Sequence, residues 1–144
     1  MMARAHEALF PVCEELNVAF VAFSPMANGF LTGAYRPGTQ FTDGQDYRAA
    51  MPQYTEEGYT KAQGLLELLR GLATEKGATM GQLSLAWMLC KKPYIVPIPG
   101  SRKVERLREN FAAGEIVLTP EEIAAIDAKL DTMDFDVFGG HSRK

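Results

Sequence analysis

Apolar residues recur along this chain with two kinds of spacing. Intervals of three and four residues, typical of amphipathic helices, cover residues 3–16, 58–76, 79–90 and 119–130. Unbroken apolar runs at residues 18–23 and 94–98 predict strands, and the first run is typical of a parallel strand covered on both faces, as in α/β folds. The pattern therefore favours a helix-rich chain of the α/β class.

Capping signals and side-chain patterns refine these elements. Thr79 with Gln82 forms a capping box that opens a helix to about Cys90. That helix is apolar on nearly every side, so we expect it to be buried against other elements, with Trp87 in the core. A second capping box, which starts at Thr119, opens the last helix.

Residues 34–57 show no regular spacing and are rich in Gly, Pro, Thr, Asp, Gln and Tyr. Loops of this length are functional lids or plain surface connections, and the residues alone leave both interpretations open. Residues 134–144 predict a frayed tail. No repeat or composition shift marks a boundary, so we predict one domain over residues 1–144.

The stretch from Ile95 to Asn110 joins a strand to a basic helix. Gly100 lets the backbone turn close to a ligand, and Ser101 is a good N-cap for a helix that runs to about Phe111. Four polar residues are then spaced to share one face of that helix: Arg102, Arg106, Glu109 and Asn110.

Free N–H groups in the first turn of that helix, together with two guanidinium groups, suit a phosphate. One turn further on, Glu109 and Asn110 suit the amino group and a ring nitrogen of an adenine. This combination predicts a site for a phosphorylated nucleotide. The alternative is that the basic residues form a solvated helix face with Glu–Arg pairs, and the spacing does not separate the two interpretations.

These segments carry a resemblance to a known family. Pro99–Arg102 followed by Arg106–Asn110 resembles the eighth strand and following helix of the aldo-keto reductases. Phe20–Met26 with Gly29–Gly33 is similar to the family's seventh strand and to the loop along the cofactor pyrophosphate. Asp46–Arg48 resembles an Asp-aromatic-Arg element of the family's long loop. The buried helix ahead of strand eight is also matched, so four elements occur in the family's order.

The resemblance implies NADP(H) as the cofactor, with its 2′-phosphate and adenine on the basic helix. The implied cofactor-binding residues are Ser24, Pro25, Met26, Gly29, Leu31, Gly33, Gly100, Ser101, Arg102, Arg106, Glu109 and Asn110. One departure is Gly100, which stands where a branch of the family has a phosphate-binding Lys. Without the resemblance, Gly29 and Gly33 would be interpreted first as turn residues.

The resemblance also implies the fold, which is the C-terminal portion of a TIM-type (β/α)8 barrel. A complete barrel needs about 250 residues. The 144 residues here therefore predict an incomplete, helix-rich barrel and a single partial domain. The family's catalytic Asp, Tyr, Lys and His would lie upstream, so no catalytic residue is assigned in this chain. His6 and His141 lie near the two ends, outside the context of the family's catalytic motifs.

Composition narrows the remaining classes. A net charge of −3 and a single local basic cluster argue against a general nucleic-acid binder. Cys13 and Cys90 lack metal-ligand spacing and are expected to be buried thiols in a reducing compartment, with no metal site. No apolar run approaches the ~20 residues of a membrane span, so we expect a cytoplasmic protein without a membrane partner.

The sequence thus predicts the cofactor-binding part of an NADP(H)-dependent oxidoreductase that reduces aldehydes or ketones and is inactive without its catalytic part. The alternative is a non-catalytic half-barrel module that dimerises and binds a nucleotide or only a protein partner. In both cases the strand edges and the apolar helix need cover. We therefore expect a homodimer or larger assembly, or pairing with a missing N-terminal half.

Overall fold

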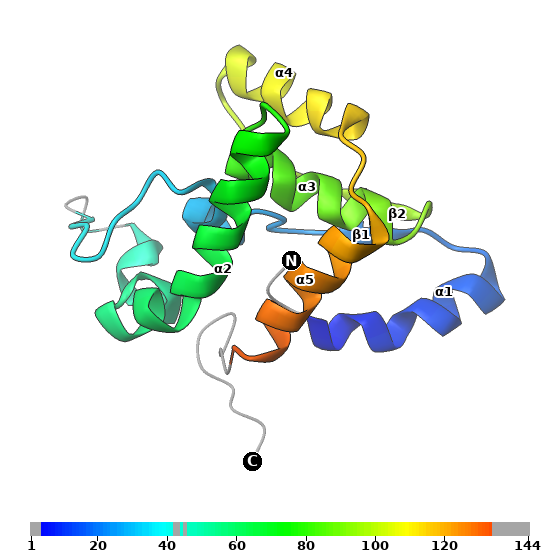
Figure 1. Cartoon of the computed structure of the whole chain (residues 1–144), viewed down its shortest axis with the longest axis horizontal. Coiled ribbons are helices and arrows are strands. Elements are labelled where there is room, and N and C mark those ends of the chain that lie inside the picture. The colour runs from blue at the N-terminus through cyan, green and yellow to red at the C-terminus, as the bar shows by residue number, and fades with distance from the viewer. Residues whose placement is uncertain (1–3, 42–43, 45, 134–144) are drawn as a thin grey trace.

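The structure is a computed structural model that describes residues 4–41, 44 and 46–133 (Figure 1). Its elements, with 3₁₀ helices labelled η, are η1 (Arg4–Leu9), α1 (Phe10–Leu16), β1 (Phe20–Ala22), η2 (Ala27–Thr32), η3 (Tyr47–Ala50), η4 (Pro52–Tyr54), α2 (Glu56–Glu75), α3 (Met80–Lys91), β2 (Ile95–Pro97), α4 (Val104–Ala112), η5 (Ala113–Glu115) and α5 (Pro120–Asp131). The predicted helices are thus confirmed with shifted ends, except that the first half of the one predicted over residues 3–16 is the 3₁₀ helix η1. The predicted tail lies outside the described residues.

The strands β1 and β2 form a parallel pair in which Val21 lies opposite Val96. Both are shorter than predicted, and β1 ends at Ala22, two residues before Ser24 enters the left-handed region with a φ of 46°. One face of the pair is covered, because Ile95 is buried where β2 packs on α3. The prediction of cover on both faces is wrong for the described residues: Val21 is 58% exposed and Val96 is 46% exposed, since the described helices lie on one face only.

Helix α3 is the buried centre of the fold, as its apolar pattern predicts. Leu83, Leu85 and Ala86 have almost no exposed surface, because α2, η2, β2, α4 and η5 pack around them (Figure 1). Trp87 lies in the core as expected, and its ring nitrogen Nε1 donates a hydrogen bond to Asp127 Oδ1 at 2.9 Å. Both predicted capping boxes are formed.

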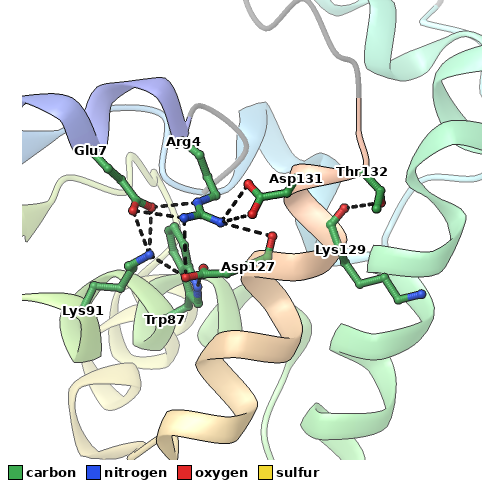
Figure 2. Close-up of polar contacts among 8 residues, drawn as sticks. All are labelled: Arg4, Glu7, Trp87, Lys91, Asp127, Lys129, Asp131 and Thr132. Carbon is green, nitrogen blue, oxygen red and sulfur yellow. Dashed lines mark hydrogen bonds and ion pairs between the residues drawn. The ribbon is translucent and has the colours of Figure 1, made fainter.

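An ion-pair cluster ties the N-terminal segment to α3 and α5 (Figure 2). Lys91 Nζ lies 2.8 Å from Glu7 Oε1 and 2.8 Å from Asp127 Oδ2. Arg4 pairs with Glu7 at 3.1 Å and with Asp131 at 2.9 Å. Charges from three elements that are distant in sequence therefore hold η1 in place.

Residues 34–57 contain more structure than their irregular pattern predicts. Beside η3 and η4 they form an aromatic cluster, in which the ring of Tyr54 lies 5.4 Å from that of Tyr35 and 4.8 Å from that of Phe41, centre to centre. The segment lies at the opposite end of the molecule from α1 (Figure 1). Helix α2 then begins earlier than predicted, because the Thr55 hydroxyl caps it by accepting from the Gly58 N–H.

Two smaller findings complete the fold. Cys13 and Cys90, which were expected to be buried thiols, are only partly buried. Among the described residues, no helix combines the length and the apolar character that crossing a membrane requires.

Candidate functional site

The two segments with predicted ligand chemistry lie at one edge of the strand pair. We call residues 24–33 the post-strand loop, because they follow β1 directly; Gly100 and Ser101 follow β2. Since β1 and β2 are parallel and adjacent, their carboxyl ends lie together, and the Ile98 N–H still donates to the Ala22 carbonyl at 3.0 Å there. In α/β barrels this edge carries the ligand sites.

The post-strand loop has an unusual backbone. Its left-handed residues are Ser24 (φ 46°), Ala27 (φ 49°), Asn28 (φ 58°), Gly29 (φ 95°) and Gly33 (φ 70°). For residues with a side chain this conformation costs about 1–2 kcal/mol each. Gly33 has a second constraint, since a Cβ there would lie 2.6 Å from Met80 Sδ. Gly29 and Gly33 are therefore turn residues, as the sequence without the resemblance suggests. This role is compatible with contact to a ligand.

Helix α3 forms the floor under this loop. The fully buried Ser84 hydroxyl donates to the Pro25 carbonyl at 2.8 Å. Gly81 lets Met26 come close, because a Cβ at Gly81 would lie 3.3 Å from Met26 Sδ. Leu31 has no exposed surface, so its side chain holds the loop on the core and would reach a ligand only if the loop moved.

Helix α4 begins later than the sequence predicts. The predicted N-cap, Ser101, is wrong: the helix starts at Val104, with Lys103 at the N-cap position and no side-chain cap. The reason is local, since Ser101 Oγ accepts the Lys103 N–H at 3.1 Å and closes a turn before the helix. Arg102 therefore precedes the helix. The prediction that Arg102 shares a helix face with Arg106 is also wrong.

The remaining polar residues of α4 diverge. Glu109 Oε2 lies 2.6 Å from Arg106 Nη1, and its Oε1 accepts from the Thr79 hydroxyl at 2.8 Å. The Glu109 carboxylate thus faces the start of α3. Asn110 instead lines an apolar recess of about 460 Å³ between α3, β2 and α4. Its Nδ2 is buried there with no hydrogen-bond partner among the described residues.

Two features at the start of α4 fit an anion. No side chain caps the helix, so its first-turn N–H groups remain available. Arg102 is exposed and forms no ion pair within the described part of the chain, whereas Arg106 already shares Glu109. A phosphate here would meet the guanidinium group of Arg102, which has no ion pair in the described part of the chain, and that of Arg106, which Glu109 also binds.

Three of the described tyrosines have raised pKa values. Burial raises the pKa of Tyr54 and of Tyr59. Desolvation, with a hydrogen bond to Glu14, raises the pKa of Tyr94 to about 12. A general acid works best with a pKa near the operating pH, so these three phenols are unlike catalytic donors. Within the described residues no group of three His, Cys, Asp or Glu side chains is placed to hold a metal ion.

Several residues that shape this edge had weak signals in the sequence. Ser84 lies in an apolar helix, and its small polar side chain is the one sequence signal that it contacts the loop. Asn28 directly precedes a glycine, which is a common left-handed pair. The sequence marks the Asp46–Arg48 element, but the contact of its Tyr47 with Asn28 of the post-strand loop joins residues far apart in sequence and has no periodic signature.

Comparison with known proteins gives the family. The aldo/keto reductase family model matches residues 1–131. An aldo-keto reductase of Schizosaccharomyces pombe, yakc, whose name specifies NADP(+), is 36% identical over 131 residues, covering 91% of this chain and 38% of that protein. The aldo-keto reductase str7 of Strobilurus tenacellus is 37% identical over 119 residues, covering 83% of this chain and 35% of that protein.

Solved structures agree with this result. The thermostable aldo-keto reductase Tm1743, crystallised with the inhibitor epalrestat, matches with a TM-score of 0.61 at 30% identity, over 88% of this chain and 35% of that one. The glycerol dehydrogenase AKR11B4 from Gluconobacter oxydans has a TM-score of 0.76 at 22% identity, over 93% of this chain and 40% of that one, which shows likeness of fold. The chain belongs to the aldo/keto reductase family, and it spans 35–38% of the length of the two relatives matched by sequence.

Proposed function

We propose that this chain is the cofactor-binding, C-terminal part of an NADP(H)-dependent aldo-keto reductase, and that residues 1–144 form one partial domain of an incomplete (β/α)8 barrel. The main support is the parallel pairing of β1 with β2, because it brings the post-strand loop and the start of α4 to one edge, with α3 beneath both. The relative whose name specifies NADP(+) supports the choice of cofactor.

Each part of the site receives a part of the cofactor in this proposal. The 2′-phosphate lies on Ser101, Arg102, Arg106 and the free N–H groups at the start of α4. The pyrophosphate lies along the post-strand loop, and the adenine lies near Glu109 where that residue meets α3. Asn110 stays in the proposed set because its buried amide donor has no partner among the described residues.

Bound NADPH would supply the hydride that reduces an aldehyde or ketone. The residues of this chain would bind and orient the cofactor, while the proton donor would come from a catalytic part of the enzyme outside these residues. We therefore propose that the chain alone does not oxidise NADPH in the presence of aldehydes. Substrate-dependent oxidation above a blank, abolished by a substitution in this chain, would contradict this. A cytoplasmic location is part of the same proposal.

The test of the cofactor site compares two nucleotides. Adenosine 2′,5′-bisphosphate carries the 2′-phosphate and AMP does not, so calorimetry should show tighter binding of the bisphosphate, with a gap that shrinks in high salt. Charge-assisted hydrogen bonds contribute about 1.5–3 kcal/mol. Exposure of the arginines to solvent reduces this free energy. We therefore expect the affinities for the two nucleotides to differ by about tenfold, equal to about 1.4 kcal/mol.

Two arginines of one helix provide the variant and its control. Arg106→Ala should narrow the gap between the two nucleotides. Arg108→Ala removes the same charge from the same helix but lies two residues further on, which rotates it to the far side, so it should leave the gap unchanged. Equal affinities for both nucleotides in the wild type, unaltered by Arg106→Ala, would mean that the basic residues are a solvated helix face and would refute the cofactor assignment.

One observation favours the second candidate, an associating module. The uncovered face of the strand pair carries Val21, Phe23, Val96 and Ile98, each about half exposed or more. Parallel sheets are normally covered on both faces, so we propose that a second copy of the chain, or a separate catalytic part, covers this one. Light scattering at micromolar concentration should give a mass above 15.9 kDa. A monomer with a cooperative thermal melt would contradict association of copies.

A further inference from the structure

The strained backbone of the post-strand loop needs an external support. Ala27, Asn28 and Gly29 are three successive left-handed residues, and two of them carry side chains. Such a run persists only where surrounding structure determines it. Helix α3 holds Pro25 from below through the Ser84 hydroxyl, and Pro25 lies two residues before the three strained ones.

The support comes from residues 46–54, which we call the clamp segment. Its contacts meet at Asn28. The Tyr54 hydroxyl donates to the Asn28 main-chain carbonyl at 2.9 Å. The Tyr47 hydroxyl donates to Asn28 Oδ1 at 3.0 Å, and Asn28 Nδ2 donates to Met51 Sδ at 3.5 Å. The main chain and the side chain of one strained residue are therefore held by the same segment.

Arg48 supports a second contact of the loop, the one between Tyr35 and Gly29. Its guanidinium carbon lies 5.1 Å from the ring centre of Tyr35 and 4.8 Å from that of Phe41, and its Nε donates to Asp46 Oδ1 at 2.9 Å. Arg48 also donates to the Tyr35 hydroxyl. The Tyr35 ring lies directly against Gly29, because a Cβ at Gly29 would be 3.1 Å from Tyr35 Cε2. Arg48 thus acts on the loop through Tyr35.

We propose that the clamp segment pre-organises the post-strand loop for the pyrophosphate of the cofactor, with Asn28 and Tyr54 as positioning residues. This rests on the proposed function, which assigns the loop to the pyrophosphate. A loop already held in its binding conformation loses little conformational freedom when the ligand arrives, and this raises affinity. The clamp therefore acts on affinity for the pyrophosphate and not for the adenosine end.

The first measurement needs no ligand. Four amides report on the loop, because each donates within it: Ala27, Gly29, Leu31 and Gly33. In Tyr54→Phe their hydrogen exchange should quicken by about tenfold, the change for one lost hydrogen bond of about 1.4 kcal/mol. Amides of α5 should not change.

Tyr59→Phe is the matched control. Tyr59 is as buried as Tyr54 and its ring lies 5.0 Å from that of Phe30 in the same cluster. Its hydroxyl makes no hydrogen bond of normal geometry to a described residue. Tyr59→Phe should leave the exchange of the loop unaltered. Unchanged exchange in Tyr54→Phe, or equal change in both variants, overturns the clamp whatever the ligand is.

The second measurement separates positioning from general loss of stability. NADP⁺ contains the pyrophosphate and adenosine 2′,5′-bisphosphate does not, so Tyr54→Phe should weaken NADP⁺ several-fold more than the bisphosphate. Equal weakening of both overturns the positioning role. If the wild type binds neither nucleotide, the proposed function fails and the positioning role fails with it, while the exchange result still decides whether the segment clamps the loop.

Discussion

Two glycines of helix α2 should respond in opposite ways to the same substitution. A Cβ at Gly58 would lie 2.1 Å from the Pro52 carbonyl oxygen and 2.9 Å from Gln53 Cα, so Gly58→Ala must displace backbone of η4. At Gly71, in the same helix, a Cβ would meet nothing within 4 Å. Gly71→Ala therefore only replaces a poor helix former by the best one.

The expected magnitudes follow from these distances. Overpacking against backbone costs about 1–3 kcal/mol, whereas removing an exposed helical glycine stabilises by about 0.5–1 kcal/mol. An unfolding entropy of about 2.1 cal/mol/K per residue gives about 0.3 kcal/mol/K for a chain of this length. Gly58→Ala should therefore lower the Tm by about 3–10 °C, and Gly71→Ala should raise it by about 2–3 °C.

Thermal and urea unfolding followed by far-UV circular dichroism measure both changes. Gly58→Ala should also quicken amide exchange in the post-strand loop, because η4 carries Tyr54 and the clamp contact to Asn28. A rise in Tm in both variants would show that helix propensity alone decides the outcome. The close approach of α2 to η4 would then be wrong.

Three further predictions test other contacts. Lys91→Met removes one of the two cations, Lys91 and Arg4, that the carboxylates of Glu7 and Asp127 share, so urea unfolding should show a loss of about 2 kcal/mol, and proteolysis should quicken at the N-terminal segment first. Trp87→Phe keeps an aromatic ring but removes the hydrogen bond to Asp127, and should cost about 1 kcal/mol by circular dichroism. Hydrogen bonds from Arg48 lower the pKa of Asp46, so stabilisation by this carboxylate is complete above its unfolded-state pKa of about 3.9 and is lost as the pH falls toward the folded-state value. Melts between about pH 5 and about pH 3 should shift less in Asp46→Asn than in the wild type; equal shifts would refute the pairing.

The elements that sequence patterns predicted well are those whose signals are local. Thr79 and Thr119 open helices with capping boxes because all partners lie within three residues. The apolar helix around Trp87 is buried as predicted, since a helix that is apolar on every side needs neighbours.

The predictions that failed depended on competition or on distant contacts. The Ser101 hydroxyl can either cap a helix or close a turn, and in the structure it closes a turn by accepting the Lys103 N–H. The face of the strand pair that carries Val21 was predicted to be covered, but cover for it has to come from outside the described residues. The contact between Tyr54 and Asn28 joins residues that no periodicity relates.

The pairing of β1 with β2 also has a consequence for the order of folding. Phe20 pairs with Ile95, so a loop of roughly 75 positions must close before the sheet forms, and that closure is entropically costly. The hairpin of α2 and α3 between them needs only local contacts and should form first. The strand pair then completes last and opens first by sub-global unfolding. A weakened variant would therefore lose the edge that carries the site while its helical circular dichroism stays nearly intact.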